Sequence, residues 1–229
     1  MKPEVLINKG RQRSSGTNLN YFAKMGHIYI MDNHLAAVWC WDRVPKDLKF
    51  SILHIDAHDD LGDSPPWEFI YGKIDLTKIP IDEIVSYRDT RNCQYFLWDN
   101  YIHLFNDKYP KLINKLLFMT HNPVSKSRLL GVEIENFDIL QLDSIPWSQP
   151  NNRKILNLDI DYFFRQDNNI KNEFLNHDQI DYFSDWLMKN KDNFDQITIA
   201  LSPECCGSWE NSINMANRIL KPLEISIEI

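Results

Sequence analysis

The sequence predicts an α/β fold with three layers, α/β/α, around a mostly parallel central sheet, in one domain over residues 1–229. Apolar strand candidates alternate with amphipathic helix candidates along the chain, as in proteins with parallel sheets. The strand candidate at 52–55 carries apolar residues on both faces, which is typical of a sheet covered by helices on both sides. Polar residues follow the strand candidates at their carboxyl ends, where open α/β sheets carry their sites.

The individual elements follow from local patterns. The strand candidates are rich in β-branched and aliphatic residues and lie at 27–31, 50–56, 155–159 and 196–201. The helix candidates have apolar residues at helical spacing and lie at 34–41, 94–105, 180–187 and 209–220. Residues 112–119 fit either a strand or the end of a helix, and residues 223–229 favour an edge strand. The run Gly-Asp-Ser-Pro-Pro at 62–66 predicts a break in the chain.

Two interpretations are open for residues 1–20. Their content of glycine, serine and arginine is typical of a mobile lead-in segment. The same segment could instead form a loop over an active site.

Bulk composition argues against several classes of function. The net charge of −7 argues against a general nucleic-acid-binding surface. The four cysteines include no CxxC pair, which favours reduced thiols and a cytoplasmic protein over a disulfide framework. The first residues form no long apolar stretch, and no run of about 18 apolar residues occurs, so neither a signal peptide nor a membrane span is expected. The sequence leaves the oligomeric state open.

The densest group of metal-binding side chains comes at the end of the strand candidate at 50–56. Asp56, His58 and Asp60 stand at alternate positions, so in an extended chain their side chains leave the same face. Asp159 and Asp161 repeat this spacing at the end of the strand at 155–159. Neighbouring carboxylates repel one another unless a proton or a cation lies between them. The two motifs together therefore predict a metal site.

His34, shortly after the strand at 27–31, completes a set of six candidate ligands. Six side chains exceed what one zinc ion needs, and they suit two divalent cations that share carboxylates. The excess of oxygen ligands favours Mn²⁺ over Zn²⁺. Two-metal centres of this kind carry out hydrolysis. His54 shares the parity of Asp56, and it fits either a hydrogen-bond donor to a ligand or an ordinary core histidine.

The blocks at His34, at residues 56–60 and at residues 159–161 resemble those of the ureohydrolases, the family of arginases and agmatinases. The resemblance is confined to these short blocks and the order of the strands. It implies an arginase-like sheet fold and a centre of two Mn²⁺ ions. One ion would be held by His34, Asp56, Asp60 and Asp159, and the other by Asp56, His58, Asp159 and Asp161.

The same resemblance implies roles for further residues. Glu204, after the strand at 196–201, matches in order the family's glutamate that receives a guanidinium group. Asp60 or Asp161 would take a proton during the reaction. The family's proton-transfer histidine has no counterpart shortly after the first motif. His121, at a strand end, is preferred as its substitute over His103, which lies within a helix candidate.

The loop that grips the α-carboxylate and α-amine of free arginine is also missing, which suggests a larger substrate. With Asp99 and Asn100 opening a helix and Ser202-Pro203-Glu204 late in the sequence, the whole chain resembles the small peptide-arginase branch. Those enzymes convert arginine side chains of a precursor peptide to ornithine and release urea. The resemblance therefore implies an arginine-containing precursor peptide as partner, with Asp99 and Asn100 as substrate-binding candidates.

Three alternatives are open at this point. The first is an arginase- or agmatinase-type hydrolase of a free small guanidino compound. The second is a zinc deacetylase-like amidohydrolase, against which the surplus carboxylates Asp60 and Asp161 argue. The third is a metal-stabilised binding module without turnover. Metal content separates a two-manganese hydrolase from a one-zinc amidohydrolase, and turnover separates both from a binding module.

Overall fold

The structure is a computed structural model that describes residues 2–62, 73–124, 129, 131–145, 151–167 and 170–229. Of the chain break expected at 62–66, residues 63–66 lie outside this part of the chain. All six candidate metal ligands lie within it.

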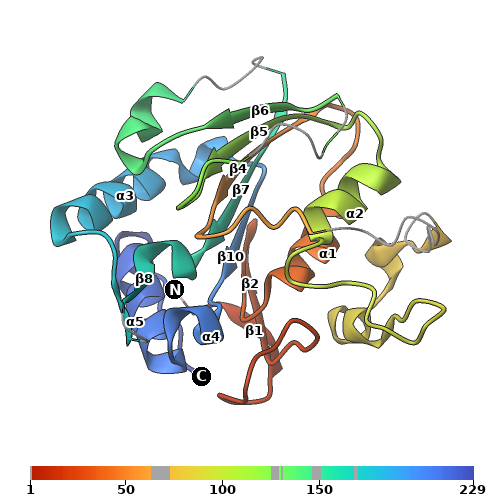
Figure 1. Cartoon of the computed structure of the whole chain (residues 1–229), viewed down its shortest axis with the longest axis horizontal. Helices are drawn as coiled ribbons and strands as arrows, with labels where there is room; N and C mark the ends of the chain where they lie inside the picture. The colour runs from red at the N-terminus through yellow and green to blue at the C-terminus, as the bar shows by residue number, and fades with distance from the viewer. Residues whose placement is uncertain (1, 63–72, 125–128, 130, 146–150, 168–169) are drawn as a thin grey trace.

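An eight-stranded sheet runs through the centre of the molecule in the order β1-β2-β3-β10-β7-β4-β5-β6 (Figure 1). Along the part of the sheet with the order β3-β10-β7-β4-β5-β6, each strand pairs in parallel with its neighbour. The pairs β1-β2 and β2-β3 are antiparallel. The strands are β1 (Glu4–Asn8), β2 (Tyr21–Met25), β3 (Ile28–Met31), β4 (Phe50–Ile55), β5 (Ile113–Met119), β6 (Glu133–Asn136), β7 (Arg153–Asp159) and β10 (Gln196–Ala200). A separate antiparallel pair consists of β8 (Phe164–Asp167) and β9 (Ile170–Glu173).

Helices cover both faces of the sheet (Figure 1). One face carries α1 (Ala37–Trp41) and α2 (Tyr101–Lys108), and the other carries α3 (His177–Asn190) and α5 (Trp209–Leu220). The short α4 (Pro203–Cys206) follows β10. The 3₁₀ turns are η1 (His34–Ala36), η3 (Leu76–Lys78), η4 (Ile81–Ser86), η5 (Ile139–Ser144), η6 (Ile160–Phe163), η7 (Lys191–Asn193) and η8 (Lys221–Leu223). Among the described helices, none is both long enough and apolar enough to cross a membrane.

Two hydrophobic layers hold these helices to the sheet. On the α1 and α2 side, Phe105 packs against Trp41 and Phe50, with ring centroids 5.5 and 5.7 Å apart. On the α3 and α5 side, Phe183 packs against Phe163, with ring centroids 5.4 Å apart. All six residues of β4 are buried, because this strand lies between the two layers. The predicted three-layer arrangement around a mostly parallel sheet is confirmed.

Two element predictions are corrected. The helix expected at 94–105 begins at Tyr101, because the side-chain amide of Asn100 bonds the backbone of Leu97 and Tyr95 and forms a turn there. Residues 223–229 form no strand. The backbone N–H and C=O of Ile227 bond the side chain of Asn217 instead, so they are satisfied without a neighbouring strand.

Candidate metal centre and its cavity

Four neighbouring parallel strands end at the same edge of the sheet and bring the predicted ligands together. His34 opens η1 shortly after β3, Asp56 follows β4, and Asp159 is the last residue of β7. These strands occur in the order β3-β10-β7-β4, so their carboxyl ends are adjacent. Residues far apart in the sequence therefore form one cluster.

Local turns orient the side chains of the two aspartate motifs, at residues 56–60 and 159–161. Asp56 Oδ1 accepts a hydrogen bond from the backbone N–H of His58 at 2.7 Å, and Asp159 Oδ1 accepts one from that of Asp161 at 2.8 Å. Both are Asx turns, a geometry that aspartate favours. The side chains thus converge through turns that follow β4 and β7, and not through the alternation of an extended chain expected from the spacing. Asp60 has φ of 50°, in the left-handed region that aspartate tolerates better than most residues.

The first candidate ion site lies around His34, which is 2% exposed. Its Nδ1 atom lies 3.2 Å from Asp56 Oδ2, 3.1 Å from Asp60 Oδ2 and 3.3 Å from Asp159 Oδ2. His34, Asp56 and Asp60 offer donor atoms that all lie within 4.8 Å of one another. Three carboxylates thus converge on one imidazole nitrogen in a buried position, a donor set that fits a divalent cation.

The second candidate site lies around His58, whose side chain is exposed. Its Nδ1 atom lies 3.3 Å from Asp56 Oδ1 and 3.1 Å from Asp161 Oδ2. Asp56, His58 and Asp161 again offer donor atoms within 4.8 Å of one another. Asp56 therefore belongs to both groups, and its two oxygens face different histidines. This is the position of a carboxylate that bridges two ions.

Protons occupy this cluster in the absence of a cation. Burial, together with the charges of Asp60 and Asp161, raises the pKa of Asp56 to about 7. Hydrogen bonds to Asp161 and Asp56 raise the pKa of His58 to about 11. Asp56 Oδ2 is buried and, among the described residues, accepts no hydrogen bond. Buried carboxylates that retain protons are sites at which a cation can replace them, so the residues fit the implied metal centre.

Tyr101 and Asn157 form a chain of hydrogen bonds that ends at the carboxylate of Asp60. The Tyr101 hydroxyl donates to Asp60 Oδ2 at 2.9 Å, and Asn157 Nδ2 donates to the same hydroxyl at 2.7 Å. Sequence reasoning missed both residues, and Tyr101 in particular falls within the helix candidate at 94–105, whose apolar spacing favours a packing role. The signal for Asn157 was present, since it is a polar residue within the apolar strand candidate that ends at Asp159.

His54 has a structural partner in the same network. Asn157 Nδ2 lies 2.8 Å from His54 Nδ1, and His54 Nε2 lies 3.2 Å from the backbone oxygen of His58. Because the amide donates to Nδ1, the proton of the ring is on Nε2, which donates to the carbonyl of His58. Burial lowers the pKa of His54 to about 4, so the ring is neutral. His54 thereby holds the turn that carries His58, in line with the first of its two interpretations.

A cavity of about 380 Å³ opens above the cluster. Besides candidate ligands, its lining contains the carboxylates of Asp32, Asp59, Asp99 and Glu204. In the described part of the chain, neither lysine nor arginine lines it. The cavity therefore has a strongly acidic wall, which suits a cationic ligand.

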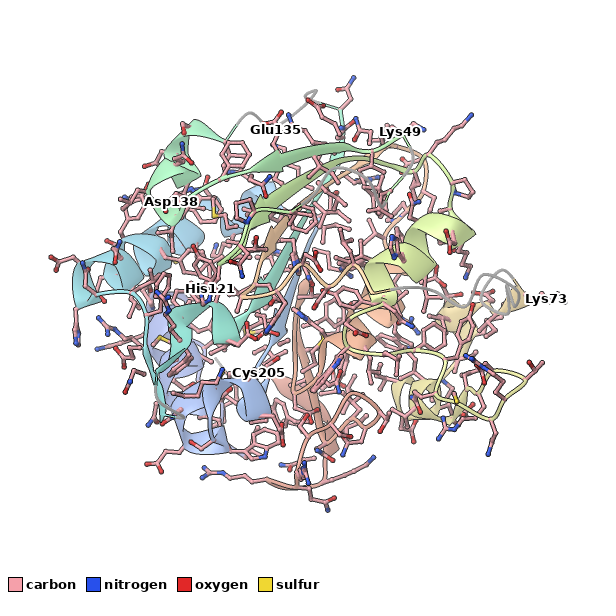
Figure 2. All side chains as sticks on the ribbon, in the orientation of Figure 1. Lys49, Lys73, His121, Glu135, Asp138 and Cys205 are labelled. Carbon is pink, nitrogen blue, oxygen red and sulfur yellow. The ribbon has the colours of Figure 1, made fainter. Side chains whose placement is uncertain are left out.

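Glu204 and Asp99 both line the cavity. Glu204 is on α4, directly after β10, and Asp99 lies in the turn before α2. Burial raises the pKa of each carboxyl above its ordinary value, and hydrogen bonds from Ser14 oppose this effect at Glu204. Cys205, next to Glu204 on α4, also lines the cavity; its position is labelled in Figure 2.

Two predicted site residues are not brought into the cavity. Asn100 is 1% exposed, and both atoms of its amide are used by the turn before α2. His121, which Figure 2 labels, follows β5. Its Nε2 atom lies 2.9 Å from the backbone oxygen of Tyr162, and its ring packs on Phe174. Neither residue lines the cavity as the structure describes it. A catalytic role for His121 stays a prediction.

No protein-family model matches the chain, and no curated protein matches its sequence. The chain resembles a solved structure of a hypothetical agmatinase from Burkholderia thailandensis, with 13% identity and a TM-score of 0.51 over 86% of this chain and 57% of that one. A second match is proclavaminate amidino hydrolase from Streptomyces clavuligerus, with 13% identity and a TM-score of 0.45 over 85% of this chain and 63% of that one. This chain therefore spans less than two thirds of the length of either neighbour. At such identity the first likeness shows the fold alone, and the expected arginase-like α/β fold is confirmed.

Proposed function

We propose that the chain is a metal-dependent hydrolase that cleaves the guanidinium group of an arginine side chain in a peptide, leaving ornithine and releasing urea. One observation carries the proposal: Glu204 lines the same cavity as both histidines and three of the aspartates of the cluster, His34, His58, Asp60, Asp159 and Asp161. A carboxylate binds a planar guanidinium through two parallel charge-assisted hydrogen bonds. The same cavity therefore supplies a partner for the cation and a site for the hydrolytic chemistry.

Each of the two ions would be held by its own subset of the cluster, and Asp56 and Asp159 would belong to both subsets. His34 with Asp56, Asp60 and Asp159 would hold one Mn²⁺, and His58 with Asp56, Asp159 and Asp161 would hold the second. Two such ions, when bound, acidify water and polarise the group that it attacks. Asp60 or Asp161 accepts the proton that the attacking water loses. Glu204 holds the guanidinium while its C–N bond breaks, and the proton taken from water passes to the departing ornithine amine, so that urea and protonated ornithine are the two products.

The charge of the cavity supports a substrate without a free carboxylate. The α-carboxylate of free arginine would meet Asp59 and Asp99, which also line the cavity. Arg13 acts on Glu204 through its charge, but it does not line the cavity. In a peptide the same carboxylate is part of an amide, so this repulsion is absent. The four free cysteines support the cytoplasmic location that the proposal retains.

The test compares three guanidino substrates with Mn²⁺-loaded protein. We expect urea and an ornithine product from a capped arginine-containing peptide, and much less urea from free arginine or agmatine. The same peptide with citrulline in place of arginine is the matched control, because it is isosteric and uncharged. Turnover of free arginine without turnover of the peptide would contradict the peptide substrate. Urea from agmatine alone would favour a small guanidino compound, and release of acetate from an acetyl-lysine peptide would favour the deacetylase-like alternative.

A further inference from the structure

We infer that Ser202 is a positioning residue for Asp159, a carboxylate that both ions of the proposed centre would share. The inference rests on the metal-dependent part of the proposed function and extends it to a residue outside the six candidate ligands. Ser202 lies between β10 and α4, and its hydroxyl donates a hydrogen bond to Asp159 Oδ2 at 2.5 Å. Both residues line the cavity.

The pairing of β10 with its two neighbouring strands determines where Ser202 lies. On one side, Ala200 at the end of β10 lies opposite Asp159 at the end of β7. On the other side, the backbone N–H of Ser202 donates to the carbonyl of Asp32, just after β3, at 3.2 Å. The backbone of Ser202 is therefore held at the edge of the sheet where Asp159 ends its strand.

The backbone of Ser202 has a conformation that serine rarely adopts. Its φ of 42° and ψ of 56° lie in the left-handed region, where a residue other than glycine is stable only if the surrounding structure holds it. The N–H groups of Cys205 and Cys206 donate to the carbonyl of Ser202, at 2.9 and 3.0 Å. The strained residue is therefore fixed between the end of β3 and the first turn of α4.

Ser202 and Ser208 each precede a helix, but their hydroxyls have different partners. A serine at this position commonly accepts a hydrogen bond from a backbone N–H in the first turn of the helix. Ser208 accepts such a bond from the N–H of Asn211, at 3.0 Å, at the start of α5. The side chain of Ser202 forms no such bond with α4 and donates to Asp159 instead. The left-handed turn thus directs a hydroxyl to a candidate metal ligand.

This hydrogen bond completes the orientation of the Asp159 carboxylate. Oδ1 accepts from the N–H of Asp161 at 2.8 Å, and Oδ2 accepts from Ser202. Rotation of the carboxylate would break these bonds, so Oδ2 stays near His34 Nδ1, at 3.3 Å. Each oxygen carries two lone pairs and can therefore accept a hydrogen bond and still bind a cation. A carboxylate oriented in advance loses less conformational freedom when an ion binds.

The experiment uses Ser202→Ala and Ser202→Gly in the full chain, with Ser208→Ala as the matched control. Both Ser202 variants lose the hydroxyl, but glycine adopts the left-handed conformation without strain, so a loss that the two share does not come from the backbone. Isothermal titration calorimetry should show Mn²⁺ affinity lowered by about 10- to 100-fold in both, the range typical of residues that orient ligands. The amount of Mn²⁺ bound at saturation should not change, because no ligand is removed. Ser208→Ala should keep the wild-type affinity, since Ser208 does not line the cavity as the structure describes it.

The outcomes separate this inference from the proposed function. Wild-type affinity in Ser202→Gly would overturn the inference, because the hydroxyl would then be dispensable. Loss of an ion at saturating Mn²⁺ in either Ser202 variant would also overturn it, because Ser202 would then be a ligand. A wild-type protein that binds Mn²⁺ but releases urea from no guanidino substrate would overturn the proposed function alone, since the titration measures binding. A wild-type protein that binds no Mn²⁺ would overturn both.

Discussion

The hydroxyl of Tyr101 donates a hydrogen bond to Asp60 Oδ2 across 2.9 Å, which links the first turn of α2 to the candidate metal centre. The same oxygen lies 3.1 Å from His34 Nδ1. Asn157 holds the Tyr101 hydroxyl from the sheet side at 2.7 Å. The direction of the Asp60 carboxylate is therefore set before any ion binds.

Removing this hydroxyl should weaken metal binding. Partners that orient ligands typically contribute 10- to 100-fold to metal affinity, so we expect Tyr101→Phe to lower Mn²⁺ affinity by about that factor. Isothermal titration calorimetry with Mn²⁺ measures the change. Tyr182→Phe is the matched control, because Tyr182 donates to Asp143 at 2.8 Å on the exposed surface of α3. Wild-type affinity in Tyr101→Phe would show that Asp60 needs no such support.

The shared position of Asp56 predicts an unequal effect of ligand removal. Asp56 belongs to both His/Asp groups, whereas Asp161 belongs to one. We expect Asp56→Ala to lose both ions and Asp161→Ala to lose one, with urea release abolished in each. Elemental analysis after equilibrium dialysis against Mn²⁺ gives the ratio of metal to protein. Asp192→Ala, which removes an exposed acid paired with Lys191, should bind as much metal as wild type. Equal losses in Asp56→Ala and Asp161→Ala would exclude a bridging role for Asp56.

His121 offers a test in which sequence and structure give different expectations. The family resemblance suggested it as a proton donor, but its Nε2 faces the backbone oxygen of Tyr162 and its ring packs on Phe174. We expect His121→Gln to retain urea release within a few-fold of wild type and to lower stability by about 1 kcal/mol through the lost contacts. Steady-state kinetics and urea unfolding measure the two effects. A loss of activity of about 100-fold or more at unchanged metal content would restore the catalytic role.

The sequence predicts that the six candidate ligands come together, because the carboxyl ends of neighbouring parallel strands lie at one edge of the sheet. Once His34, Asp56 and Asp159 were assigned to the ends of parallel strands, the fold required them to meet at one edge. Glu204 followed from the same rule after β10. For His34, Asp56, Asp159 and Glu204, the fold class and the positions of the strand ends are enough to predict that the residues lie at one edge of the sheet.

What the sequence did not reveal depends on side-chain contacts between distant segments. The start of α2 at Tyr101 is set by the amide of Asn100, which stabilises a turn where the periodicity favoured a helix. The edge strand expected at 223–229 is replaced by backbone bonds to Asn217. The bond from Tyr101 to Asp60 likewise joins residues from different elements. Local periodicity carries no information about such partners.

The raised pKa values of the cluster predict how the stability of the metal-free protein depends on pH. The pKa of His58 is about 11 in the folded protein and about 6.5 in an unfolded chain, so the folded state holds this proton more tightly. Its contribution to stability is complete below pH of about 6.5 and is lost as the pH rises through about 11. Asp56, with a folded-state pKa of about 7, acts with the same sign from about pH 4 to about pH 7. His54 opposes this trend only between about pH 4 and pH 6.5, because its folded-state pKa is about 4.

Above pH of about 6.5 the groups of the cluster all act in one direction, so they should make the metal-free protein lose stability as the pH rises. Lys46, whose pKa burial lowers to about 8, opposes this trend only above about pH 8. Metal binding displaces the protons of the cluster, so Mn²⁺ affinity should increase over the same range. The Tm in excess chelator should fall between about pH 6.5 and pH 9.5, and the gain in Tm on adding Mn²⁺ should grow. His58→Gln should flatten the first trend, since it removes the group whose pKa is raised most clearly. If the Tm in excess chelator rises over this range, or does not change, the cluster does not bind protons more tightly in the folded protein than in the unfolded chain.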